Sequence, residues 1–293
     1  MISQTISNWI NIVGIATIVI PILVVIVWKL LFDGRIWTVF LGVVVYMIFG
    51  QLVLSFVNSS ALSPEKFDIT QPGSVAVYVI YMALITALCE EGGKFVLFKF
   101  VIKPCEDKEE ALSVGIGHGG MAGIMVLGAN CLMFNMVNKM FAAGDNASLL
   151  SLLGSQGAID AYATKLAALS VGSLLLMLLE QVLMMAFNIF STFFVFMSAR
   201  KPEKSRVFIF MIVAHAIFVV PSVLNDRGII PLWSTELILL VLVAVFAYFG
   251  IKEYKAYVNT HNYDPSKSRW NKNKVRKPEP KGPQKGGTKK KHK

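Results

Sequence analysis

The sequence predicts an all-helical, polytopic membrane protein with about seven transmembrane helices. Three observations predict this fold class. Of the 293 residues, 55% are hydrophobic and 16% are charged, whereas a soluble domain carries about a quarter charged residues. Several apolar runs exceed the roughly 18–20 residues that cross a bilayer, and basic residues gather in alternate loops. We expect one integral membrane domain, residues 1–255, with its motif-bearing core at about 73–225, and a basic tail at 256–293.

The apolar runs divide the chain into seven predicted spans. Their approximate limits are 7–31, 36–57, 73–102, 110–138, 166–199, 206–224 and 231–252. Small and polar residues at about 141–163 predict a connection between the fourth and fifth spans, with room for a short interfacial helix. We expect no cleavable signal peptide, because the N-terminus lacks a basic region and the first apolar run is as long as a full span.

The distribution of Lys and Arg predicts the orientation, since short cytoplasmic loops carry the excess of basic residues. One set of loops carries Lys29, Arg35, Lys99, Lys103, Lys108, Arg200, Lys201, Lys204 and Arg206. The opposite loops carry Lys66, Lys139, Lys165 and Arg227. Residues 252–293 add 14 of the 28 Lys and Arg to the richer side. We therefore predict that the N-terminus lies outside and the C-terminus in the cytoplasm, in a multi-pass protein of the cytoplasmic membrane.

The tail and the cysteines carry less information. The tail is rich in Lys, Pro, Gly and Asn and cannot bury enough apolar surface to fold alone. We interpret it as a solvated topology anchor; binding of anionic lipids and contact with RNA are the alternatives, and the tail has no specific nucleic-acid motif. Cys89 and Cys131 fall within predicted spans and Cys105 falls in a cytoplasmic loop, so reduced thiols are expected.

Polar residues occur at a similar depth in four of the predicted spans. The adjacent carboxylates Glu90 and Glu91 lie roughly 18–20 Å from the cytoplasmic end of the third span, at 1.5 Å per residue. His118 lies about 12 Å into the fourth span, Asn188 about 18 Å from the end of the fifth, and His215 about 14 Å into the sixth. Charges inside a membrane are costly and usually mark a functional site, so we expect these side chains to meet.

These residue types favour a metal site or a water-activating site. Two imidazoles and a carboxylate are the usual catalytic ligands of zinc and leave one position for water, so His118, His215 and Glu91 are candidate zinc ligands. A second carboxylate could take the proton from that water. Lys94 follows Glu90 by four residues and Glu91 by three, and either pair can form on a helix. Asn188 is a supporting candidate, as a further ligand or as an oxyanion donor.

Glycines surround His118 in the segment "GIGHGGMAG". We interpret Gly119, Gly120 and their neighbours first as sites of close helix packing. The alternative is that they leave room for an extended substrate backbone beside His118. For the polar residues the alternative is also structural, because a single intramembrane His or Asn is often a hydrogen-bonding bridge between helices.

At these positions the chain resembles a known family. The segments "EEGGK", "GIGHGGMAG", "EQVLMMAFNIFST" and "AHAIFVV" are similar to the successive motifs of the YhfC-like membrane proteins, which are grouped with the CAAX-protease and bacteriocin-processing (CPBP) superfamily of intramembrane metalloproteases. "EEGGK" also resembles the Glu-Glu-x-x-Lys signature of PrsW-type membrane proteases. The resemblance implies a catalytic centre in which Glu90 or Glu91 activates water, with His118 and His215 as metal or oxyanion partners.

The chain departs from the family pattern at several positions. Ala122, Asn188 and Val219 stand where relatives often carry polar or ionisable residues. Three hypotheses about function therefore stay open. The first is a metal-dependent or glutamate-dependent intramembrane peptidase that acts on a membrane-associated peptide or protein from the cytoplasmic half of the bilayer. The second is a catalytically altered relative that binds a membrane partner as a scaffold. The third is a transporter or ion-relay component.

Overall fold

The computed structural model describes residues 2–32, 35–61, 72–102 and 107–257, and it confirms the all-helical fold class. Seven helical segments of this part of the chain are long and apolar enough to span a bilayer. They are Gln4–Phe32, Ile36–Ser60, Gly73–Val101, Lys108–Ala143, Val171–Arg200, Pro202–Asp226 and Leu232–Ala256. The predictions on Lys66, Lys103, Cys105 and the tail lie outside the described residues. Cys89 and Cys131 are both buried free thiols.

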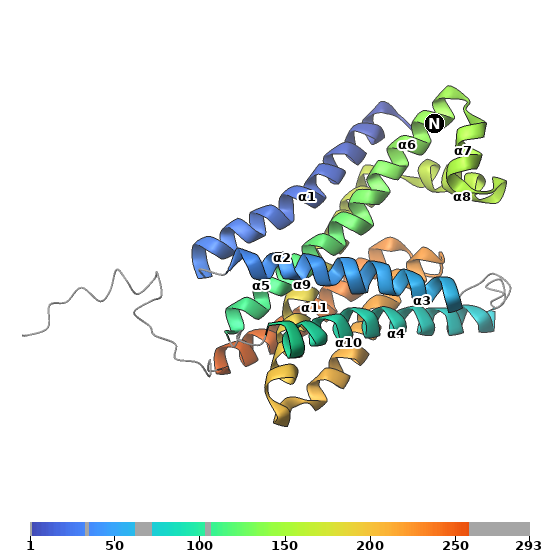
Figure 1. Ribbon diagram of the computed structural model, residues 1–293. Coiled ribbons are helices and arrows are strands. Elements are labelled where there is room, and N and C mark those ends of the chain that lie inside the picture. Colours follow the sequence, from blue (N-terminus) through green and yellow to red (C-terminus); the bar gives the residue numbers. More distant parts are fainter. Residues whose placement is uncertain (1, 33–34, 62–71, 103–106, 258–293) are drawn as a thin grey trace, which may run out of the picture. The chain divides into compact units, whose positions relative to one another are not determined.

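The α-helices follow one another along the chain as labelled in Figure 1. Their bounds are α1 Gln4–Phe32, α2 Ile36–Val45, α3 Leu54–Ala61, α4 Pro72–Val96, α5 Lys108–Gly123, α6 Ala129–Ala143, α7 Asn146–Leu153, α8 Gln156–Ala168, α9 Val171–Arg200, α10 Arg206–Asp226 and α11 Leu232–Ala256. Three π-helical segments continue or join them: η1 Tyr46–Val53, η2 Leu97–Val101 and η3 Ile124–Gly128. A short 3₁₀ turn, η4 Pro202–Lys204, leads into α10. Such π segments often occur at functional sites. Tyr46 of η1 packs against the ring of His118.

The fourth span is longer than the sequence predicts. Segments α5, η3 and α6 form one helix of 36 residues, Lys108–Ala143, which is about 54 Å long at 1.5 Å per residue. The hydrocarbon core of a bilayer is about 30 Å thick, so one end of this helix extends beyond it. Polar residues such as Asn135 and Asn138 in α6 fit that position, and they bond to Asn11 and to the backbone of Ile2 near the start of α1.

The connection between the fourth and fifth spans contains two helices, where the sequence predicted room for one. Gly144, at φ 68°, ends α6, and Asp145 begins α7 by accepting a hydrogen bond from the Ser148 backbone N–H at 3.0 Å. Gly154, at φ 80°, and Ser155 end α7 and begin α8 in the same way. Glycine takes this left-handed conformation without steric cost, and short polar side chains cap helix N-termini. The turn residues therefore divide the connection in two.

A separate apolar core joins this connection to α1, as α6 runs beside α1 (Figure 1). Its buried members are Ile10, Val13, Leu127, Cys131, Phe134, Val137, Leu149, Ile159, Leu166 and Leu174. They come from α1, η3, α6, α7, α8 and the start of α9. The main core lies elsewhere, around α9, which packs against α5, α11, α10 and α4. The most buried span is thus the one that carries Asn188.

The glycines of α5 allow close helix packing, which was the favoured interpretation of this segment. A Cβ atom on Gly115 would lie 2.7 Å from the Ile189 Cα atom of α9, and one on Gly119 would lie 2.8 Å from the Met185 Cα atom. A Cβ atom on Gly117 would overlap the backbone carbonyl of Val39 in α2. Small residues at these positions bring the backbones of α2, α5 and α9 into contact.

We expect Gly117→Ala to destabilise the protein by about 1–3 kcal/mol, because the added methyl group forces α2 and α5 apart. The thermal unfolding midpoint in detergent measures this change. Gly92→Ala is the matched control, since a Cβ atom on Gly92 meets nothing within 4 Å. That control should be neutral or stabilising, because alanine is the better helix former. Equal midpoints for the two variants would contradict the packing.

Candidate active site

Four spans bring the predicted polar residues into one buried cluster. Glu90, Glu91 and Lys94 come from α4, His118 from α5, Asn188 from α9 and His215 from α10. Glu91, Lys94 and His118 have no exposed surface, and His215 is 3% exposed. Lys94 and His215 are hydrogen-bonded to Glu91, and His118 is hydrogen-bonded to Glu90. The common depth read from the sequence thus corresponds to a real convergence of side chains.

Lys94 is the structural centre of the cluster. Its Nζ atom donates hydrogen bonds to Glu91 Oε1 at 2.8 Å, to Asn188 Oδ1 at 2.7 Å and to Ser191 Oγ at 3.0 Å. All three donor positions of an ammonium are thereby used. The sequence left the partner of Lys94 open between Glu90 and Glu91, and the structure pairs it with Glu91.

Glu91 also holds His215 in one orientation. Its Oε1 atom lies 2.5 Å from His215 Nδ1, and because an ionised carboxylate only accepts, this nitrogen carries the hydrogen and donates it. A neutral His215 then has its lone pair on Nε2, on the opposite side of the ring. That nitrogen lies 3.9 Å from Glu90 Oε2. Glu91 therefore directs the basic nitrogen of His215 toward Glu90.

Glu90 lies between the two imidazoles. Its Oε2 atom is 2.9 Å from His118 Nε2, which donates to it by the same argument. His118 Nδ1 and Glu91 Oε2 are buried and have no hydrogen-bond partner among the described residues. Two carboxylates and one ammonium leave the cluster with one excess negative charge when both histidines are neutral. Buried polar atoms without partners are uncommon, so the cluster retains hydrogen-bonding capacity for a ligand.

Aromatic rings from two other segments enclose the histidines. Tyr46 of η1 meets the His118 ring edge-on with ring centroids 5.2 Å apart, and its hydroxyl oxygen accepts a hydrogen bond from Gln51. Phe187 of α9 meets the His215 ring edge-on at 5.1 Å. These rings limit the rotation of both imidazoles and keep bulk water away from them.

Asn188 supports Lys94 and is not free for a ligand. Its Oδ1 atom accepts from Lys94, and its Nδ2 atom donates to the Met184 carbonyl one turn earlier in α9. Ser191, which the sequence analysis missed, accepts the remaining hydrogen of the Lys94 ammonium. Its spacing of three residues from Asn188 puts both on one face of α9. This spacing is the feature of the sequence that could have identified Ser191 as a partner of the cluster.

The side chains, as arranged, do not fit a metal ion. Within residues 2–32, 35–61, 72–102 and 107–257, no three His, Cys, Asp or Glu side chains are placed to hold one. Of the predicted ligands, Glu91 Oε1 is shared between Lys94 and His215, and His118 Nε2 is directed at Glu90. Zinc ligand atoms lie about 2.0–2.3 Å from a common centre. Glu91 and His118 are thus engaged by other side chains in this arrangement.

Comparison with known proteins gives two matches. The sequence model of the YhfC intramembrane metalloprotease family matches residues 16–243. The chain is also 24% identical over 255 residues to a protein of Bacillus subtilis (strain 168) described as "Uncharacterized membrane protein YhfC"; the match covers 87% of this chain and 98% of that protein. No solved structure matches this chain. The region matched by the family includes every residue of the buried cluster.

Proposed function

The chain belongs to the YhfC intramembrane metalloprotease family, and we propose that it hydrolyses peptide bonds of membrane-associated polypeptides inside the bilayer. One observation carries this proposal. Glu90, a carboxylate within a predicted span, lies 2.9 Å from His118 Nε2 and 3.9 Å from His215 Nε2. A buried carboxylate flanked by two imidazoles, one of them oriented by a second carboxylate, is an arrangement suited to proton transfer.

We assign Glu90 as the general base. The 3.9 Å between Glu90 Oε2 and His215 Nε2 is too long for a direct hydrogen bond, and it suits a water molecule that donates to both atoms. Glu91 keeps the His215 lone pair on that side. His118 fixes the Glu90 carboxylate by donating to it. The three side chains would thus hold a water molecule ready to lose a proton.

The reaction balances with these groups alone. The water oxygen attacks the carbonyl carbon of the peptide bond, while Glu90 takes one water proton. When the C–N bond breaks, Glu90 returns that proton to the leaving nitrogen, so the products are an amine and a carboxylic acid that keeps the other water proton and ionises after release. Lys94 neutralises Glu91, which keeps Glu91 ionised as the partner of His215. Lys94, Asn188 and Ser191 are positioning residues in this account.

The residue types predict zinc at this site, whereas the hydrogen bonds of Glu91 argue against it. The metal content of the purified protein, compared with that of the His118→Ala/His215→Ala variant, tests it. About one zinc per chain, lost in the double variant, would support the predicted ligands and require the side chains to rearrange. A folded, metal-free protein that cleaves peptides would contradict a zinc requirement. We expect the second result, because Glu91 is engaged by Lys94 and His215.

We propose the orientation and location that the charge distribution supports, with the N-terminus outside, the C-terminus in the cytoplasm and the site opening to the cytoplasmic half of the cytoplasmic membrane. The basic tail would then face anionic lipid headgroups. A C-terminal reporter that is active only in the cytoplasm tests the orientation. An inactive reporter on a chain that is present in the membrane would contradict it.

Mapping of new peptide N-termini in membranes tests the proposed activity. Cells that produce the wild-type chain should contain cleaved membrane polypeptides that are absent with Glu90→Gln. The matched control is Glu203→Gln, a carboxyl change in η4, outside the buried cluster, which should leave the cleavage pattern unchanged. Identical patterns for the wild type and Glu90→Gln would contradict a peptidase function.

A non-catalytic binding scaffold is the second candidate. One observation favours it. Glu91, Asn188 and Ser191 all accept hydrogen bonds from Lys94, so these polar side chains are already paired within the protein. A scaffold would keep a folded cluster and bind its membrane partner equally well with Glu90→Gln. The terminus mapping separates the two candidates, because only a peptidase generates new termini.

A further inference from the structure

A second group of carboxyl side chains lies in the membrane domain, apart from the candidate active site. Glu180 comes from α9, Ser222 and Asp226 from the last part of α10, and Glu236 from the second turn of α11. The proposed reaction uses none of these residues. In the proposed orientation, these parts of the three helices lie toward the outer face of the membrane.

Glu236 occupies a core position of α11. The buried residues of this helix include Glu236, Leu239, Val243 and Gly250, whose spacing places them on one face. That face packs against α9, where a Cβ atom on Gly250 would lie 2.5 Å from the Phe190 Cδ1 atom. Leu239 and Val243 belong to the main apolar core. A carboxyl group therefore stands where the helix pattern calls for an apolar side chain.

The Glu236 carboxyl group has no partner at this position. Glu236 is 3% exposed, and both of its oxygen atoms are buried without a hydrogen-bond partner among the described residues. No Lys, Arg or His in the described part of the chain forms an ion pair with Glu236 or Glu180. A buried carboxylate without such partners is so costly that the group takes up a proton instead.

The neighbouring charges act in the same direction. The helices α9 and α10 pack against α11, and Glu180 of α9 is close enough to interact electrostatically with Glu236. Asp226 of α10 interacts in the same way with Glu180. The basic residues of this region, Lys165 and Arg227, interact with Asp226. Glu236 therefore faces a negative group, and a nearby like charge disfavours its own ionisation.

A hydrogen bond from Ser222 assigns the negative charge to Glu180. The Ser222 hydroxyl donates to Glu180 Oε1 at 2.6 Å, a distance that is typical of a hydroxyl bonded to an ionised carboxylate. Glu180 is also less buried than Glu236. Of the two carboxyl groups, Glu180 is thus suited to carry the charge and Glu236 to carry a proton.

We propose that Glu236 is a proton-binding site, a carboxylic acid that stays neutral in the folded protein at neutral pH beside an ionised Glu180. Release of this proton would place a second negative charge in the apolar contact between α11 and α9. The packing of these helices is then weakened as the pH rises. The stability of the membrane domain is therefore sensitive to pH through a group that lies outside the candidate active site.

An aromatic layer separates the two sites. Phe187 of α9 stacks on Phe218 of α10 with ring centroids 4.1 Å apart, and it meets Phe246 of α11 edge-on at 5.0 Å. Along α10, Phe218 comes between His215 and Ser222, which lie about 10.5 Å apart along the helix axis. The proton of the second site is therefore distinct from those that the proposed reaction moves.

The pH dependence of unfolding tests the proposal. The folded chain would keep a proton that the unfolded chain releases above the ordinary pKa of glutamic acid, about 4.3. Stability then falls as the pH rises, because the folded state binds more protons. From about pH 5 to about pH 7, the unfolding equilibrium constant of the wild type should rise relative to that of Glu236→Gln by up to about tenfold per pH unit. Denaturant unfolding of the full chain in detergent measures both constants.

Infrared spectroscopy provides a readout that needs no unfolding. At neutral pH, the carbonyl band of a protonated carboxyl group should be present in the wild type and missing in Glu236→Gln. The band should weaken in the wild type as the pH rises. In Glu180→Gln it should weaken at a lower pH, because the negative charge that opposes ionisation of Glu236 is gone. Glu203→Gln, a change of an exposed carboxyl group in η4, is the matched control and should behave as the wild type does.

Two results would overturn the proton-binding site. The first is the same pH dependence of unfolding in the wild type and Glu236→Gln, with no infrared band lost in the variant. The second is a rise of the wild-type unfolding midpoint on addition of Ca²⁺ or Na⁺ that Glu236→Gln abolishes. Glu236 would in that case be an ionised carboxylate that holds a metal cation, since carboxylate oxygens are ligands of such hard cations.

Discussion

Glu90→Gln is expected to lower the rate constant for peptide cleavage by about 10²–10⁴-fold, the contribution of a well-placed general base. The glutamine amide can still accept the hydrogen bond from His118, but it cannot take a proton from water. The unfolding midpoint should therefore stay close to that of the wild type. Initial cleavage rates in liposomes, at equal amounts of folded protein, measure the effect.

Glu91→Gln distinguishes the two adjacent carboxylates. Glu91 is the counter-ion of Lys94 and the partner of His215 Nδ1, so its replacement should lower stability as well as activity. Glu203→Gln should change neither. A full loss of activity in Glu91→Gln together with near-normal activity in Glu90→Gln would reverse the assigned roles.

Lys94→Met is expected to destabilise the protein by about 3–5 kcal/mol, because it leaves Glu91 buried in the membrane domain without its ammonium partner. Both side chains have no exposed surface, so water cannot replace the lost charge. Asn188 and Ser191 also lose their shared donor. Denaturant or thermal unfolding in detergent measures the loss.

Two further variants control this prediction. Lys204→Met breaks an ion pair with Glu253 at 2.6 Å whose partners are 36% and 37% exposed, and it should cost no more than about 1 kcal/mol. The double variant Lys94→Met/Glu91→Gln removes both charges and should recover part of the lost stability. Equal losses of unfolding free energy for Lys94→Met and Lys204→Met would show that the buried ion pair stabilises the protein no more than the exposed one.

The convergence of the site could be predicted from the sequence, because helical rise converts residue spacing into depth. Glu90, His118 and His215 needed no further information to be assigned to one level of the bilayer. The rotation of each helix about its own axis, in contrast to the depth of its residues, cannot be obtained from residue spacing alone. Spacings of three and four residues both bring side chains together on a helix, so the sequence left Lys94 between Glu90 and Glu91. Only the packing of α4 against α9 and α10 selects Glu91.

Other features depend on contacts between distant segments. Gln181 Oε1 has no hydrogen-bond partner among the described residues, and the residues next to Gln181 in the sequence do not indicate this. The two helices α7 and α8 were missed as a pair, although Gly154 and Ser155 are ordinary helix-end residues. Their apolar faces become recognisable only against the core that they share with α1 and α6.

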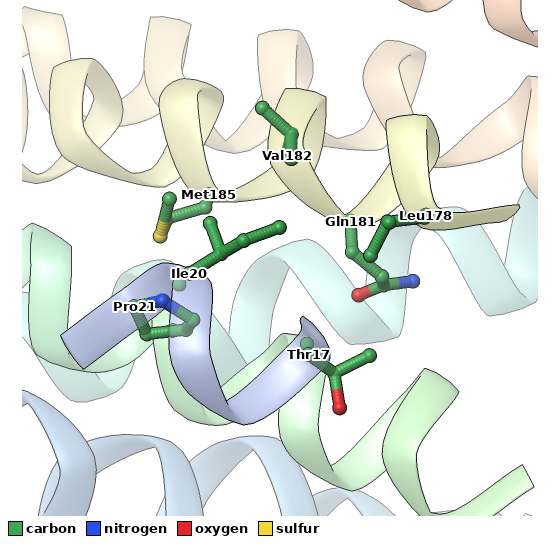
Figure 2. A pocket seen from close by; sticks show the side chains of 10 residues that line it. Thr17, Ile20, Pro21, Leu178, Gln181, Val182 and Met185 are labelled. Atoms are coloured by element: carbon green, nitrogen blue, oxygen red, sulfur yellow. The ribbon is translucent and has the colours of Figure 1, made fainter. Parts of the chain in front are cut away.

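The structure confirms close packing, the first of the two roles that the sequence left open for the glycines around His118, and room for a substrate backbone stays a prediction. Gly115 and Gly117 face the backbones of α9 and α2 directly, which is close packing. Gly119 and Gly120 pack against Met185 and Pro21 and also line a narrow crevice between α1, α5 and α9 (Figure 2). Gly123 has the most open surroundings of the crevice glycines. These glycines have different neighbours because each position faces a different direction, which is set by the rotation of α5 about its axis.

The central claim is that Glu90 activates water for hydrolysis of a peptide bond within the membrane domain. Its most direct test is cleavage by the purified protein, in liposomes prepared with ¹⁸O-labelled water, of a peptide that spans a mapped cleavage site. The account predicts that the new C-terminal carboxylate carries the label with the wild-type chain and that no product forms with Glu90→Gln. Unchanged cleavage by Glu90→Gln, or no cleavage by the folded wild-type chain, would contradict it.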